Sequence, residues 1–126
     1  MIDFKLLKNS FSYAAEGIRY AFTNDQNMRI HVVVAILVII ASLIFKVTSG
    51  EMGILAVVII LVITTEMINT SIEKMTDLIT KEYRTEAKIA KDVAAGMVLI
   101  AALGAVIVGI FIFTPYVMKA LSFSSS

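Results

Sequence analysis

Residues 93–113 read VAAGMVLIAALGAVIVGIFIF and carry no charged side chain. A helix needs about 20 consecutive apolar residues to cross the ~30 Å hydrocarbon core of a bilayer. The stretch therefore predicts a transmembrane helix over residues 93–113. Pro115 follows shortly afterwards, and because proline has no backbone N–H to donate, we expect it to mark the end of this helix.

Two further apolar stretches predict two more transmembrane helices. Residues 30–49 are interrupted only by His31 and Lys46, which lie near the two ends of the stretch. The second stretch, which begins at Met52, stays uncharged only as far as Thr65 and is too short to span a bilayer alone. Its helix must therefore continue through acidic residues, and we expect it over residues 52–73, followed by a loop over residues 74–92.

The N-terminal residues 1–23 are too polar to span a membrane, but they repeat apolar side chains at spacings of three and four. This pattern predicts an amphipathic helix lying in the membrane interface, and a helix packed on a soluble partner is the alternative. The apolar stripe consists of Phe4, Leu7, Phe11, Ala15, Ile18 and Phe22. We expect an all-α integral membrane protein with one domain, residues 1–126, that combines this surface helix with three transmembrane helices.

The composition agrees with a membrane protein and excludes several classes of site. Of the 126 residues, 59% are hydrophobic and 17% are charged, and the net charge of +1 offers no basic surface for nucleic acid. The absence of cysteine excludes thiolate nucleophiles and cysteine-ligated metals, and His31 is the only histidine. A bound cation would therefore need carboxylate oxygens, which makes Mg²⁺ the natural candidate.

Basic residues are distributed unequally between the two predicted sides of the membrane. Four precede the first span and five lie between the second and third spans, whereas the opposite side holds only Lys46 and Lys119. Because cytoplasmic loops carry the excess of Lys and Arg, we expect the N-terminus and the 74–92 loop to face the cytoplasm.

Three helices enclose little interior, so polar groups within them need protein neighbours from elsewhere, and self-association is expected. Ala101, Ala105 and Gly109 form a row of small residues on the third span, which would allow a second helix to approach closely.

Four polar residues of the second span and its continuation follow one helical face. Glu66, Asn69, Glu73 and Asp77 are separated by three or four residues, so their side chains form a single stripe. A solvated helix end is the alternative for Asp77. It fits Glu66 poorly, because apolar residues surround Glu66 and a carboxylate at membrane depth is unfavourable.

Further polar residues are expected on the same side of the membrane. They are Asp25, Asn27 and Arg29 before the first span, and Lys91 and Asp92 before the third. Taken singly, each fits a helix cap or a membrane anchor. Together they offer what phosphoryl transfer needs, namely oxygens for Mg²⁺, a cation for phosphates and a base for a hydroxyl. The chain has neither a Walker loop nor a kinase glycine loop, so any nucleotide site would be of another type.

A small proton-coupled carrier or channel, in which Glu66 and Glu73 relay ions, is the alternative from another class. It predicts polar groups in the middle of the spans. The middle sections of the first and third spans are unbroken apolar sequence, which disfavours this alternative.

The run Glu66-Met-Ile-Asn69-Thr70-Ser-Ile72-Glu73, with Asp77, Glu82-Tyr83 and Ala90-Lys91-Asp92, resembles the signature of the prokaryotic-type diacylglycerol kinase family. The resemblance extends over the amphipathic start, the run from Asn27 to His31 and all three spans. Two runs, Arg29-Ile30-His31 and residues 87–96, resemble the Gram-positive branch of the family, whose members mostly phosphorylate undecaprenol.

The resemblance implies specific roles for the polar residues. Glu66 would be the base that takes the proton of the lipid hydroxyl, and Asn69 would position reactants beside it. Asp25, where the family usually has Glu, would hold Mg²⁺ together with Glu73. The nucleotide would contact these two metal ligands and Lys8, Tyr13, Glu82, Tyr83, Arg84, Lys91 and Asp92, and the lipid headgroup would contact Asn27, Arg29 and His31 as well as Glu66 and Asn69.

The resemblance also implies ATP and a membrane lipid alcohol as substrates, Mg²⁺ as the metal, and a homotrimer with active sites shared between subunits. The protein would reside in the bacterial inner membrane. Undecaprenol is the favoured lipid and diacylglycerol the alternative. Physical reasoning does not separate them, because both present a primary hydroxyl on an apolar body.

Overall fold

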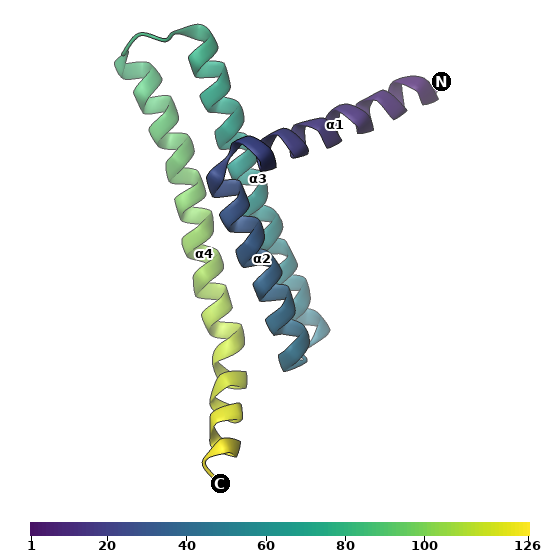
Figure 1. Cartoon of the computed structure of the whole chain (residues 1–126), viewed down its shortest axis with the longest axis vertical. Helices are drawn as coiled ribbons and strands as arrows, with labels where there is room; N and C mark the ends of the chain where they lie inside the picture. Colours follow the sequence, from purple (N-terminus) through teal and green to yellow (C-terminus); the bar gives the residue numbers. More distant parts are fainter.

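The computed structural model describes all 126 residues and is entirely helical. Four helices follow one another: α1 (Phe4–Asn24), α2 (Gln26–Phe45), α3 (Ser49–Ile79) and α4 (Thr85–Ser124). Three of them, α2, α3 and α4, are long and apolar enough to cross a membrane. Figure 1 shows these three running side by side, while α1 projects away from the bundle near one end of α2. The expected architecture of an N-terminal helix followed by three helices able to span a membrane is therefore confirmed.

Helix α1 is capped by Asp3, whose carboxylate accepts hydrogen bonds from the backbone N–H groups of Lys5 and Leu6. Its apolar stripe is exposed over most of its length, with Phe4 and Phe11 among the most exposed large side chains. An exposed apolar stripe on a helix that leaves the bundle is suited to the interfacial region of a membrane. The helix ends at Asn24, close to the expected boundary.

Helix α2 spans 20 residues, which corresponds to about 30 Å at 1.5 Å per residue. It ends where Lys46 adopts a left-handed conformation (φ 54°). Helix α3 then starts with a capping box, in which Thr48 and Glu51 exchange side-chain to backbone hydrogen bonds. This tight turn makes α2 and α3 antiparallel neighbours.

The loop expected over residues 74–92 is largely helical, which corrects the sequence-based boundary. Helix α3 continues to Ile79 and α4 begins at Thr85, so only residues 80–84 connect them. Charged residues can leave the membrane without leaving the helix, because water solvates their side chains while the backbone bonds persist. The α3–α4 hairpin therefore extends beyond the junction of α1 and α2 (Figure 1).

The expectation that Pro115 ends the third spanning helix is wrong, since α4 continues through it to Ser124. Proline removes one backbone hydrogen bond, but contacts on both sides of it fix the helix. The rings of Phe113 and Tyr116 each lie 6.1 Å from the ring of Phe45. The Tyr116 hydroxyl also donates a hydrogen bond of 2.5 Å to Glu51.

The interior of the bundle is small, and α3 and α4 form its most extensive helix pair. Its buried apolar residues include Leu55 and Val62 on α3, with Ala94, Val98 and Ala101 on α4. Of the small-residue row expected to mediate self-association, Ala101 is buried, whereas Ala105 and Gly109 line a groove within the same chain. Within this chain the row therefore faces inward.

Candidate functional site

Glu66 lies in the interior of the bundle, on the part of α3 that faces α2 and α4. Its side chain is 1% exposed, and that of Asn69, one turn later, is 6% exposed. Glu66 Oε1 and Asn69 Oδ1 are both buried without a hydrogen-bond partner. Because nearly all buried polar atoms in proteins are paired, two unpaired acceptors on one face indicate a site that a ligand completes.

A pocket of about 220 Å³ opens beside these two residues. It is bounded by all three spanning helices: Asn27 and His31 come from α2, Glu66 and Asn69 from α3, and Ala95, Val98, Leu99 and Ala102 from α4. Glu66, Asn69, Asn27 and His31, four residues that sequence reasoning assigned to the lipid end of the site, are thus gathered here.

A second, larger groove adjoins this pocket and continues along the apolar part of the bundle. It has a volume of about 350 Å³, runs between α2, α3 and α4, and shares His31 and Ala102 with the pocket beside Glu66. Apart from His31 its lining is apolar, and it reaches as far as Gly109 and Phe113. Residues 102 to 113 of α4 cover about 16 Å along the helix. A buried carboxylate therefore lies at one end of a long apolar groove.

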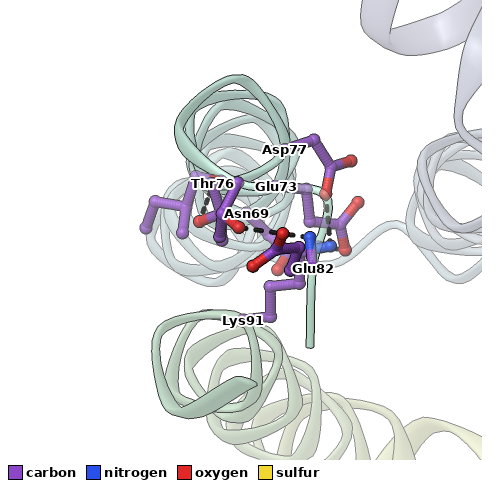
Figure 2. Close-up of polar contacts among 8 residues, drawn as sticks. Asn69, Glu73, Thr76, Asp77, Glu82 and Lys91 are labelled. Carbon is purple, nitrogen blue, oxygen red and sulfur yellow. Dashed lines mark hydrogen bonds and ion pairs between the residues drawn. The ribbon is translucent and has the colours of Figure 1, made fainter. Parts of the chain in front are cut away.

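Glu73 continues the polar stripe of α3 toward solvent. Asn69 Nδ2 donates a hydrogen bond of 3.2 Å to Glu73 Oε1, and Glu73 itself is exposed. Figure 2 shows this contact along α3. The bond orients one Glu73 oxygen and leaves the other available.

Asp25 lies between α1 and α2 and is oriented by two hydrogen bonds. Its Oδ1 caps α2 by accepting from the backbone N–H of Asn27 at 2.9 Å, and its Oδ2 accepts from the Thr70 hydroxyl at 2.9 Å. Thr70 belongs to α3, one turn before Glu73. The carboxylate of Asp25 is thereby held against the helix that carries Glu66 and Glu73.

These residues fit Mg²⁺ by donor type. No group of three or more carboxylate or histidine side chains in the chain is arranged to enclose a metal ion. Mg²⁺ does not require such an enclosure, because it commonly binds one or two carboxylates and completes its shell with water and nucleotide phosphates. Asp25 and Glu73 each retain lone pairs beyond their intramolecular hydrogen bonds.

Lys91 and Asp77 join α4 to α3 farther along the hairpin. Lys91 Nζ donates to Asp77 Oδ1 at 2.5 Å, and Figure 2 shows Lys91 reaching across from α4. The hydrogen bond from Lys91 lowers the pKa of the Asp77 carboxyl, which lies beyond the apolar part of α3. The end of the polar stripe is therefore an ion pair and not a freely solvated carboxylate.

The other residues predicted to contact the nucleotide do not lie together within this single chain. Lys8 and Tyr13 are exposed on α1, which leads away from the bundle. Glu82, Tyr83 and Arg84 are exposed in the connection between α3 and α4. There, a guanidinium nitrogen of Arg84 lies 3.7 Å from Glu82 Oε2. Asp92 is exposed and pairs with Lys88 on its own helix.

Arg29, assigned to the lipid headgroup, contacts the end of α1. Its guanidinium donates to the carbonyl oxygens of Phe22 at 3.2 Å and Thr23 at 2.8 Å. These bonds satisfy orphan carbonyls at a helix C-terminus. Arg29 thus fixes the angle between α1 and α2.

Comparison of the sequence with known proteins identifies the family of this chain. The family described as prokaryotic diacylglycerol kinase matches residues 12–113. The chain belongs to the prokaryotic diacylglycerol kinase family. The match runs from Ser12 in α1 to Phe113 in α4 and includes every residue of the pocket beside Glu66.

Three relatives of known name are similar to this chain over most of its length. A diacylglycerol kinase of Synechocystis sp. is 44% identical over 79% of this chain and 58% of its own length. An undecaprenol kinase of Bacillus subtilis is 35% identical over 84% of this chain and 86% of its own length. A diacylglycerol kinase of Helicobacter pylori is 32% identical over 77% of this chain and 76% of its own length. The chain thus spans less than two thirds of the first of these relatives, and all three are named as lipid kinases.

Sequence reasoning missed Thr70 as a member of this site. Thr70 follows Asn69 directly and lies one turn from Glu66, so its position beside these residues on the helix could be predicted from the spacing. Its partner Asp25 is 45 residues away, and no local pattern links the two.

Proposed function

We propose that this member of the family transfers the γ-phosphoryl group of ATP to the hydroxyl of undecaprenol. One observation carries the proposal: Glu66, a buried residue whose Oε1 has no hydrogen-bond partner, lies where a partly polar pocket adjoins an apolar groove. A lipid alcohol has matching chemistry, with one hydroxyl at the end of an apolar chain. The chain would occupy the groove and place its hydroxyl beside Glu66.

In the proposed reaction Glu66 accepts the hydroxyl proton as the lipid oxygen forms a bond to the γ-phosphorus. The bond between that phosphorus and the bridging oxygen breaks, and ADP leaves. The loose transition state of phosphoryl transfer needs positioning and charge neutralisation above all, so a small scaffold suffices. Burial excludes water from the proton acceptor, and Asn69 would hold the reacting hydroxyl.

Asp25 and Glu73 are the proposed ligands of Mg²⁺, which when bound neutralises charge on the nucleotide phosphates. Lys91 would exchange its bond to Asp77 for one to a phosphate oxygen. Asn27 and His31 would line the lipid headgroup. Glu82, Tyr83, Arg84 and Asp92 would contact the nucleotide from the hairpin end.

The proposal includes a homotrimer in the bacterial inner membrane with its N-terminus in the cytoplasm. Because α1 leads away from the bundle, Lys8 and Tyr13 would reach the site of an adjoining subunit and not their own. The excess of Lys and Arg around the α1–α2 junction and the α3–α4 hairpin supports the orientation. ATP would then enter from the cytoplasm and the lipid from the bilayer.

Undecaprenol is preferred over diacylglycerol because the Bacillus subtilis undecaprenol kinase matches along 86% of its own length. The apolar lining of the groove suits the hydrocarbon part of either lipid. Diacylglycerol remains the second candidate, since the Synechocystis relative of that name has the higher identity.

A competition experiment tests the proposal. Purified protein in nanodiscs receives radiolabelled ATP, Mg²⁺ and equal amounts of undecaprenol and diacylglycerol. We expect label predominantly in undecaprenyl phosphate. Predominant labelling of diacylglycerol would support the second candidate instead, and labelling of neither lipid would contradict the kinase assignment.

A further inference from the structure

The Thr70 hydroxyl makes the one side-chain to side-chain hydrogen bond between α3 and the α1–α2 junction. Its Oγ1 donates to Asp25 Oδ2 at 2.9 Å. Most other threonine hydroxyls of the spanning helices donate to carbonyl oxygens of their own helix, as Thr64, Thr65, Thr76 and Thr114 do. Thr70 differs from these residues because its hydroxyl donates to a side chain outside its own helix.

Asp25 lies between α1 and α2, and each of its two carboxylate oxygens accepts one hydrogen bond. The backbone N–H of Asn27 fixes one oxygen at 2.9 Å, which by itself makes Asp25 a helix cap. The Thr70 bond fixes the other oxygen and orients the carboxylate plane toward α3. Two bonds of this kind leave one lone-pair direction on each oxygen for a further ligand.

The position of Thr70 relates this contact to the reaction site. It directly follows Asn69, and both Glu66 and Glu73 lie within about one helical turn of it. The Asn69 amide orients Glu73 by a bond of 3.2 Å. Two adjacent residues of α3 therefore orient two carboxylates, Asn69 that of Glu73 and Thr70 that of Asp25.

We propose that Thr70 is a positioning residue that holds Asp25 in the orientation required to bind a divalent cation together with Glu73. This inference rests on the proposed function, because it takes the Asp25–Glu73 pair as the metal site. Groups that orient a metal ligand typically change metal affinity by about 10- to 100-fold when they are removed. Thr70→Val keeps the shape of the side chain and removes only the donor. Thr70→Ser keeps the donor.

The test measures Mn²⁺ binding to the full-length protein in nanodiscs by electron paramagnetic resonance, with a non-hydrolysable ATP analogue present. We expect Thr70→Val to weaken Mn²⁺ affinity about tenfold and Thr70→Ser to restore it to within about twofold. Thr76→Val is the matched control, since its hydroxyl bonds only to Ile72 of its own helix. We expect that control to bind as the wild type does.

A purely structural role for Thr70 gives different results. If the hydroxyl only stabilised the packing of α2 on α3, Thr70→Val would lower the melting temperature and raise KM for Mg²⁺ and for the lipid alike. We expect a change in the Mg²⁺ requirement with KM for the lipid within about twofold. A double-mutant cycle with Asp25→Ala distinguishes a specific effect from partial unfolding. If Thr70 acts through Asp25, Thr70→Val should have little further effect on Mn²⁺ affinity in protein that already carries Asp25→Ala.

Wild-type Mn²⁺ affinity in Thr70→Val, or an equal loss in Thr76→Val, would overturn the inference even if undecaprenol is phosphorylated. Conversely, loss of Mn²⁺ affinity specific to Thr70→Val would uphold it even if the wild type phosphorylates another lipid.

Discussion

The Lys91 ammonium on α4 lies 2.5 Å from the Asp77 carboxylate on α3, so an ion pair joins the two longest helices beyond the apolar part of the bundle. Both side chains are partly exposed, and such pairs contribute little to stability. In the proposed reaction Lys91 must leave Asp77 to reach a phosphate oxygen. A weak, solvated pair permits this exchange.

Replacement of Lys91 by Gln should raise KM for ATP by about tenfold or more, because a charge-assisted hydrogen bond to phosphate is lost. KM for the lipid should change much less. The measurement is initial rate against ATP concentration in nanodiscs. Lys81→Gln, which removes a neighbouring positive charge outside the proposed site, is the control. An equal rise in KM for ATP in Lys81→Gln would mean that Lys91 acts only through the overall positive charge of the hairpin and not through a specific bond to phosphate.

Asp77 should make a small contribution to the stability of the hairpin, and this contribution should depend on pH at acidic values. Its folded-state pKa is lowered by Lys91, so its stabilising contribution is present above the unfolded pKa of about 3.9 and is lost as pH falls through the lower folded value. The difference in melting temperature between wild type and Asp77→Asn should therefore shrink between pH 7 and pH 3. A difference that grows on acidification would show that Lys91 does not stabilise the ionised form.

The fold was largely predictable because its main determinant is local. Runs of apolar residues identify spanning helices regardless of their neighbours. The helix ends were less predictable. The charges after Glu73 mark where the chain leaves the apolar region but not where its helix ends, and Pro115 is tolerated because Phe45 and Glu51, distant in sequence, hold α4 around it.

The site was predictable to the extent that it lies on one helix. The spacing of Glu66, Asn69 and Glu73 follows from helical periodicity, and the structure confirms that they share a face. The contacts of Asp25 with Thr70, and of Lys91 with Asp77, join separate helices. No periodicity within a single helix could reveal them.

Tyr116→Phe should lower the thermal stability of the protein while leaving kinase activity within about twofold. The substitution removes the hydrogen bond to Glu51, which ties α4 to the turn between α2 and α3 at the end of the bundle opposite the proposed site. Thermal unfolding in detergent and a phosphate-transfer assay check the two expectations. A large loss of activity in protein that remains folded would mean that the far end of the bundle influences Glu66.

Gly109→Leu should block the apolar groove without disturbing the helix. A side chain added at Gly109 meets no atom within 4 Å, so it would project into the groove that Gly109 lines. We expect kcat/KM for undecaprenol to fall about tenfold or more, with a much smaller effect on geraniol, whose short chain would fill only the part near Ala102.

Gly104→Leu is the matched control for this substitution. It lies on the same helix, has equal open space around it and does not line the groove. Equal losses for the two variants, or equal losses for long and short alcohols in Gly109→Leu, would exclude the groove as the site of the lipid chain.

Phosphate transfer by Glu66→Gln protein tests the central claim most directly. The variant keeps the shape of the side chain and removes its ability to accept a proton, and Glu86→Gln on the exposed start of α4 is the control. Measured in nanodiscs with labelled ATP and undecaprenol, on protein with the same oligomeric state as the wild type, Glu66→Gln should lose at least about 1,000-fold in kcat, whereas Glu86→Gln should match the wild type. Glu66→Gln protein that retains a substantial fraction of wild-type kcat would contradict the account.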